Sequence, residues 1–302
     1  MLYTTGFAYR VRWSMYSDTP LPQEEPAGQN PPDGAVIDYN LAHDASSVVK
    51  LEIQDAAGKT LRSYSSNDTL YKIPQVNIPL YWIRPQQILS AAKGAHRFIW
   101  DLHEQPLNLP PGYAISAIYG QTAPDPTSPW VLPGVYTAKL TVDGKTYTQP
   151  ITVKMDPRVK TPVLELKKQY DLSDKCYGKY KLLLDENNKL FSLQAQAEKL
   201  LQNANGILAA SLKNIVSDAS KLRKGSPETK GESLNSLKST LLGLMNLMQG
   251  SDMPVTTQAN NAVIKSDAAF ILLNSKFDSL TGVGLKSLND QLAIAGMGKI
   301  SL

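Results

Sequence analysis

The sequence predicts an α+β protein of two domains, in which an antiparallel β-sandwich is followed by an all-α, up-down helical bundle. Three observations predict it. Residues 35–155 hold short β-branched and aromatic runs bounded by turn residues, the pattern of antiparallel strands. After residue 156 apolar residues recur at intervals of three and four, as in amphipathic helices. The two patterns follow one another without mixing, which favours two domains over an interleaved α/β sheet.

The first segment, residues 1–33, is expected to be an extended linker or the remnant of an upstream domain. Residues 18–34 read DTPLPQEEPAGQNPPDG, and proline both fixes φ and removes a backbone donor. Residues 1–16 lack the apolar core and the cleavage site of a signal peptide, and no stretch approaches the ~18 apolar residues of a spanning helix. These observations do not decide the cellular compartment of the protein, and a secreted or periplasmic parent protein is compatible with them.

The predicted β-sandwich spans residues 34–156, and alternation assigns its faces. Val49, Leu51 and Ile53 share one side of a strand, opposite charged and polar neighbours. Asp143-Gly144 separates two such strands and is typical of a type I′ hairpin turn. By the same alternation, the predicted structural core includes Phe98, Trp100 and Tyr136.

The predicted helical bundle spans residues 157–302. Thr161-Pro162 is a suitable start for its long first helix, and Thr256 or Thr257 for its last. The last helix carries an apolar stripe at spacings of three and four: Ala259, Val263, Ser266, Phe270, Leu273, Phe277 and Leu280. Earlier helices carry similar stripes, such as Leu208, Leu212, Ile215, Ala219 and Leu222.

Composition and motifs exclude several functional classes. The net charge of +4 comes from 31 basic and 27 acidic residues that are scattered, so no nucleic-acid partner is expected. Cys176 is the only cysteine and lies on the apolar side of a helix pattern, which favours a buried structural thiol. The sequence has no Gly-x-Ser-x-Gly elbow and no Glu-x-x-His motif. We therefore expect no catalytic residues, no metal and no cofactor.

One polar group is a candidate exception to that expectation. His103, Glu104 and Asp101 follow or end a predicted strand, and together they are candidates for a metal or acid–base site. The alternative is a core tryptophan on the strand with solvated polar neighbours at its exit. The alternative is favoured, because no second ligand pair with zinc-like spacing exists.

The best functional candidate is a proline-interrupted, aromatic insertion at residues 70–94, together with the loops after residue 103. Long loops of this kind are usually functional or docked. Their aromatic rings are expected either to stack on sugars or anchor a neighbouring domain, or to cap the core beneath the loop. The candidate residues for ligand or domain contact are Tyr81, Trp82, Arg84, Tyr113, Tyr119 and Trp130.

Several strings resemble a known family. NPPDGAVIDYNL (30–41), GAHRFIWDLHE (94–104) and LPGVYTAKLTVDGKTYTQPITVKMDPRV (132–159) resemble the C-terminal region of bacterial sortilin-type, BNR-repeat β-propeller proteins, which are often labelled glycosyl hydrolase or exo-α-sialidase-like. MQGSDMPVTTQ (248–258) and LKSLNDQL (285–292) look like the closing segments of that family. Trp100-Asp101, followed by the PG-x-Y strand at residues 133–136, also resembles an FlgD-like immunoglobulin-fold domain.

The resemblance implies an appendage of a propeller and no chemistry in this chain. In such proteins the propeller lies upstream and carries the Asp-box repeats, and no Ser-x-Asp-x-Gly-x-x-Trp occurs here. The expected function is a non-catalytic accessory module that packs on the propeller and mediates assembly or partner contact. Two alternatives stay open: a carbohydrate-binding module that uses the aromatic loop, and a fragment of a glycoside hydrolase whose active site lies in the propeller.

Overall fold

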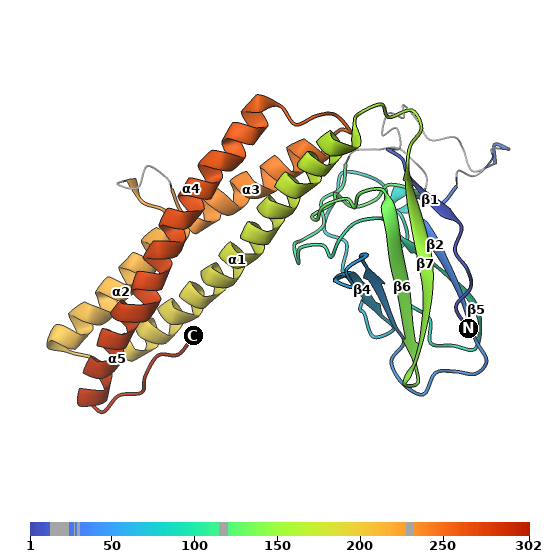
Figure 1. The fold of residues 1–302 in the computed structure, drawn as a ribbon. Coiled ribbons are helices and arrows are strands. Elements are labelled where there is room, and N and C mark those ends of the chain that lie inside the picture. The colour runs from blue at the N-terminus through green and yellow to red at the C-terminus, as the bar shows by residue number, and fades with distance from the viewer. Residues whose placement is uncertain (13–23, 27, 29–30, 115–119, 228–231) are drawn as a thin grey trace. The chain divides into compact units, whose positions relative to one another are not determined.

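The computed structural model describes residues 1–12, 24–26, 28, 31–114, 120–227 and 232–302 (Figure 1). The chain divides into two compact units, Met1–Tyr170 and Asp171–Leu302. All described strands lie in the first unit, which we call the strand unit. The second, the helical unit, contains most of α1 (Val163–Leu201) and the helices that follow it.

The larger sheet of the strand unit has five strands in the order β1-β7-β6-β3-β4. Their bounds are β1 Phe7–Arg10, β3 Lys50–Gln54, β4 Thr60–Ser65, β6 Gly134–Val142 and β7 Lys145–Met155. Strand β1 runs parallel to β7, with Phe7 opposite Thr152, whereas all other neighbours are antiparallel. The sheet is therefore mixed.

The second sheet consists of β2 (Ala35–Leu41) and β5 (Gly94–Trp100), which pair antiparallel with Ala35 opposite Trp100. The N-terminal residues extend its edge: Tyr3 N donates to Asp38 O (3.0 Å) and Asn40 N to Met1 O (2.9 Å). The same N-terminal segment continues into β1. Residues 1–10 therefore contact both sheets.

The predicted antiparallel, immunoglobulin-like β-sandwich is wrong. The larger sheet is mixed because β1 is added parallel to β7, and only two strands form the second sheet in the described part of the chain. Side-chain alternation reports which face of a strand is buried, and it is the same in parallel and antiparallel pairs. The sequence pattern therefore identified β2 to β7 without identifying their partners. It missed β1, because residues 1–33 were expected to be a linker or the remnant of an upstream domain, whereas residues 7–10 form an edge strand of the larger sheet.

The core of the strand unit lies where the alternation placed it. Val49, Leu51 and Ile53 are fully buried. Trp100 is also fully buried; its Nε1 donates to His103 O (2.9 Å), and its ring meets Tyr136 edge-on with centroids 5.4 Å apart. Replacing a large aromatic ring in such a site by alanine typically lowers the free energy of unfolding by about 3–5 kcal/mol.

The β6–β7 hairpin turns at Asp143-Gly144, whose φ angles of 47° and 74° are both positive, as a type I′ turn requires. The Asp143 carboxylate accepts from Ser47 N (2.9 Å) and Ser46 Oγ (2.8 Å). The turn prediction is confirmed. The hydrogen bonds of Asp143 also connect the tip of the hairpin to the segment before β3.

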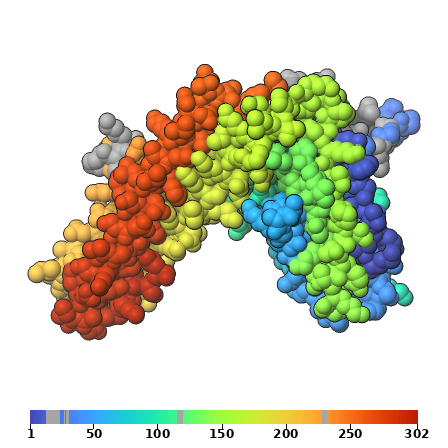
Figure 2. All heavy atoms as spheres, viewed as in Figure 1, coloured from blue at the N-terminus to red at the C-terminus, as the bar shows by residue number. Residues whose placement is uncertain are grey.

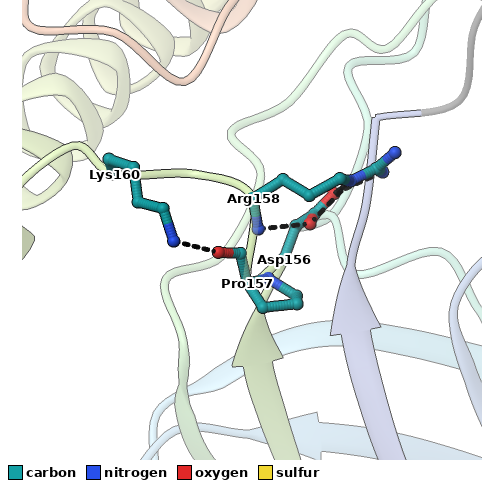
Figure 3. A network of polar contacts seen from close by, with 4 residues as sticks. All are labelled: Asp156, Pro157, Arg158 and Lys160. Atoms are coloured by element: carbon teal, nitrogen blue, oxygen red, sulfur yellow. Dashed lines mark hydrogen bonds and ion pairs between the residues drawn. The ribbon is translucent and has the colours of Figure 1, made fainter.

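The exit from β7 is a tight polar turn (Figure 3). The Asp156 carboxylate accepts from the backbone N (2.9 Å) and Nη2 (2.6 Å) of Arg158, and Lys160 Nζ donates to Pro157 O (2.8 Å). These hydrogen bonds from Arg158 lower the pKa of Asp156. The chain then enters α1, whose first residue follows Thr161-Pro162.

The helices after α1 are α2 (Gly206–Lys224), α3 (Leu234–Gln249), α4 (Thr257–Ser279) and α5 (Leu285–Ile294), with a π-helical turn η3 (Leu280–Gly284) before α5. The Thr256 side chain accepts from Ala259 N (3.2 Å), which confirms one of the two predicted caps. Ser233 caps α3 through a capping box with Ser236.

The simple up-down order predicted for the bundle is also wrong. Leu280, Gly284 and Leu285 keep right-handed helical angles, so α4 continues through η3 into α5 without a reversal. Accordingly α3 packs against α4, while α2 packs against α5. The glycines at 282 and 284 predict that the helix ends there. A π-helical turn can contain the same residues, so the composition did not distinguish a helix end from such a turn.

Candidate functional site

The aromatic insertion is held to the strand unit by backbone pairing rather than by regular structure. A short 3₁₀ turn, η1 (Leu80–Trp82), opens the paired segment. Gly120 N donates to Tyr81 O (3.0 Å), Thr122 N to Trp82 O (3.0 Å) and Arg84 N to Thr122 O (2.8 Å). Two loops that are distant in sequence therefore form one supported surface.

A second set of contacts joins the beginning of the insertion to the same region. Tyr71 and Gln86 exchange two hydrogen bonds, from Tyr71 N to Oε1 (3.0 Å) and from Nε2 to Tyr71 O (2.9 Å). The hydroxyls of Tyr71 and Tyr113 are 2.8 Å apart. Burial and then this hydroxyl contact raise the pKa of Tyr113, so its phenol stays neutral at physiological pH.

Among the described residues of this loop assembly, the most exposed large apolar or aromatic side chains have exposed fractions of 40–65%: Leu70, Tyr71, Leu80 and Tyr81. We call these four residues the loop surface. Tyrosine combines a large contact area with few rotatable bonds, which suits a binding surface. Rings held on hydrogen-bonded loops lose little further freedom when a partner covers them.

Arg84 and Trp82, the other candidates in the insertion, make contacts within the strand unit. Arg84 Nη2 pairs with Asp33 (3.0 Å) and donates to Gln121 O (3.3 Å). Trp82 is half-buried and meets Tyr81 edge-on. Its Nε1 is buried and has no hydrogen-bond partner among the described residues. Tyr119 lies outside the described residues.

Trp130 belongs to the interior, although it follows a loop. It is 8% exposed, and the His103 ring stacks on it with a 5.4 Å separation and a 5° interplanar angle. The guanidinium carbons of Arg10 and Arg12 lie 4.7 and 4.9 Å from its ring centroid. Such contacts stabilise a buried indole but leave no face for a ligand.

The polar group at the end of β5 has structural partners. Burial lowers the pKa of His103, which is therefore neutral at pH 7, and its backbone N donates to Asp101 Oδ1 (3.1 Å). Glu104 is 4% exposed and accepts a hydrogen bond from Tyr170. No cluster of three or more metal-ligating side chains occurs in the described part of the chain.

Sequence reasoning missed a second exposed surface, which lies on α4. Ile264, Ile271 and Leu272 are 57%, 68% and 46% exposed, and their i, i+7, i+8 spacing places them on one side of the helix. We call them the α4 stripe; α4 lies at the surface of the helical unit (Figure 2). The available signal was that these residues are apolar yet fall outside the buried stripe led by Ala259 and Val263.

Comparison with known proteins gives no assignment: no family model, no curated protein and no solved structure matches the chain. Among the described residues, none of the helices combines the length and the apolar character needed to cross a membrane.

Proposed function

We propose that this chain is a non-catalytic interaction module of a larger assembly, and that its partner is a β-propeller domain or protein. The choice of a propeller rests on the resemblance of residues 30–41, 94–104 and 132–159 to segments that follow such propellers. The non-catalytic assignment is supported by the carboxylates near β5, because Glu104 is buried against Tyr170 rather than set in a cleft.

The loop surface is the observation that carries the proposal. Leu80 and Tyr81 are 65% and 60% exposed on a turn whose backbone is fixed to residues 120–122. Exposed apolar and aromatic side chains grouped on a rigid support are typical of protein contact sites. Their burial by a partner contributes about 25 cal/mol per Å² of apolar surface removed from water.

The α4 stripe supports a second contact, for assembly or for a further partner. Its three aliphatic side chains form no hydrogen bonds with water. An apolar side on a surface helix commonly packs against another helix. The two surfaces lie in different units. The module therefore has one candidate contact in each unit.

A second candidate function is carbohydrate binding through the same loops. The exposed rings of Tyr71 and Tyr81 favour it, because tyrosine faces can pack against the apolar faces of sugars while the hydroxyl remains hydrated. The partner in this case is a glycan, and the helical unit takes no part in recognition.

The test mixes the purified chain with purified β-propeller proteins encoded by the same genome and measures affinity by calorimetry. Tyr81→Ser should weaken binding by about 10-fold or more, as is usual for an aromatic anchor. Tyr147→Ser is the matched control, because Tyr147 is an exposed tyrosine on β7 outside the loop surface.

A glycan array and hydrolase assays complete the design. Glycan binding that Tyr81→Ser removes, without propeller binding, would replace the interaction module by the carbohydrate-binding module. Turnover of aryl glycosides or a fluorogenic sialoside by the chain alone would overturn the non-catalytic assignment. Equal propeller affinity of Tyr81→Ser and Tyr147→Ser would remove the loop surface from the contact.

A further inference from the structure

A groove of about 480 Å³ lies between α1 and α2 within the helical unit. This volume is within the range of small-molecule sites, roughly 300–1,000 Å³. Its lining includes Phe191 and Gln194 of α1 and Ser220, Lys221, Arg223 and Lys224 of α2. None of these residues belongs to the loop surface or the α4 stripe.

Arg223 is oriented in this groove by three residues of α1. Its Nε donates to Asn187 Oδ1 (3.3 Å), its Nη1 donates to Gln194 Oε1, and its guanidinium carbon lies 4.8 Å from the ring centroid of Phe191. Positions 187, 191 and 194 follow one side of a helix. The planar guanidinium is thus fixed before any ligand arrives, and Nη2 donates to no group among the residues that the structure describes.

The charge of Arg223 is not neutralised locally. No carboxylate pairs with it in the described ranges, and Gln194 and Asn187 are neutral acceptors. Burial lowers its pKa, and burial followed by the charge of Arg223 lowers the pKa of Lys238 on α3. Glu198 is the acidic residue in the lining, against the three cations Lys221, Arg223 and Lys224.

The α2 macrodipole explains only part of this cluster. Cations are favoured in the last turn of a helix, which accounts for the exposed Lys221 and Lys224. It does not account for Arg223, whose guanidinium is directed to the side chains of α1. This arginine is oriented by neutral acceptors and an aromatic ring, and it has further N–H donors. Such an arrangement is typical of sites that recognise oxyanions.

We propose that the groove between α1 and α2 is a binding site for a small soluble ligand that carries a phosphate, sulfate or carboxylate group, with Arg223 as the residue that holds the oxyanion. The ring of Phe191, which is 61% exposed, and the hydroxyl of Ser220 are placed to contact the rest of the ligand. This site is independent of the partner contacts proposed above.

The test titrates the full chain with inorganic phosphate, sulfate or acetate against chloride at constant ionic strength, and follows the arginine Nε–Hε resonances by NMR. Arg223 should show a saturable shift with at least one oxyanion and none with chloride. Preference for phosphate and sulfate would assign a tetrahedral group, and preference for acetate a carboxylate. No saturable shift of Arg223 with any of the three overturns the proposal.

Variants separate a specific site from general attraction to a basic surface. In the variants, binding is followed by the backbone amide resonances of Ser220 and Lys221, which line the groove. Arg223→Gln should weaken oxyanion binding by about 10-fold or more, because a charge-assisted hydrogen bond is lost. Lys265→Gln, an exposed cation on α4 outside the groove, should leave it unchanged. If Arg223→Gln does not fold, Arg223→Lys replaces it, because lysine keeps the charge but lacks the planar fork of donors. Equal losses in the groove variant and in Lys265→Gln contradict the site.

Discussion

The hydroxyl of Tyr170, near the start of α1, donates a hydrogen bond to Oε1 of Glu104, whose side chain is 4% exposed. The backbone oxygen of Glu104 also accepts from Ser128 Oγ (2.8 Å) and Arg62 Nη1 (3.2 Å). A buried carboxyl group that loses a hydrogen bond is costly. The beginning of α1 is therefore part of the strand unit, and the boundary between the units falls after Tyr170 rather than at the end of β7.

Tyr170→Phe should lower the free energy of unfolding of the strand unit by about 1–3 kcal/mol, because the buried carboxyl group of Glu104 loses the hydrogen bond from Tyr170. Urea denaturation followed by tryptophan fluorescence measures the change. Tyr9→Phe is the control, since Tyr9 is 48% exposed on β1, and it should change stability by less than about 0.5 kcal/mol. A similar small change for Tyr170→Phe would show that the hydrogen bond contributes nothing.

Gly34→Ala should destabilise the strand unit by about 2 kcal/mol or more. Gly34 has φ of +136°, and an added Cβ would lie 2.1 Å from Trp100 O, so the variant combines backbone strain with a steric clash. Gly178→Ala is the opposite case: an added Cβ in α1 meets nothing within 4 Å, and alanine should stabilise that helix by about 0.5–1 kcal/mol. Thermal unfolding of both variants decides; equal signs would contradict the backbone assigned to one of them.

Trp100→Ala should cost about 3–5 kcal/mol, because it removes a fully buried ring that packs on Tyr136 and donates to His103 O. Tyr81→Ala removes an exposed ring and should cost less than about 1 kcal/mol. Chemical denaturation measures both values. A loss below about 1 kcal/mol for Trp100→Ala would place that ring at the surface.

Glu186 makes the stability of the helical unit dependent on pH. Burial, followed by the charges of Asp278 and Asp185, raises the pKa of Glu186 from 4.5 to about 7, against the opposing charge of Lys189. The folded state therefore binds the proton more tightly than the unfolded state. The stabilising contribution of Glu186 protonation is complete below pH 4.5 and is lost as the pH rises from 4.5 through about 7.

Glu186→Gln should consequently stabilise the helical unit by about 1–3 kcal/mol at pH 8 and have little effect at pH 4, where the carboxyl is protonated in both states. Urea denaturation followed by helical circular dichroism at pH 4, 6 and 8 tests this. Glu198→Gln, at an exposed position of α1, is the control and should change stability by less than about 0.5 kcal/mol. A pH-independent difference for Glu186→Gln would exclude a raised pKa.

The local features of this protein were predictable because they depend on neighbours in sequence. Alternation identified Leu51 and Ile53 as buried, since successive side chains of a strand point to opposite faces. Asp143-Gly144 supplied the positive φ angles of its turn, and Thr256 supplied a cap acceptor three residues before Ala259 N. The change from β to helical spacing after residue 156 located the end of the strands, and α1 begins at Val163.

The candidate sites could be predicted only in part. The aromatic insertion at 70–94 was identified by its composition, but its composition did not distinguish the exposed ring of Tyr81 from the buried ring of Trp130. That difference depends on His103 and Arg10, which come from other segments of the chain and enclose the indole. The groove at Arg223 had no sequence signal, because its three orienting residues lie about 30 residues away on another helix.

The sequence by itself determined the strands β2 to β7, the helical region after residue 156, the cap at Thr256 and the faces that the strands bury, because each is set by backbone stereochemistry and side-chain periodicity within a few residues. Tertiary structure decided the rest. It paired β1 parallel with β7 and carried α4 through a π-helical turn into α5. It also brought Glu104 to Tyr170 and Arg223 to Phe191. These arrangements are selected by the packing and hydrogen bonding of groups distant in the chain, whose free energies no local pattern contains.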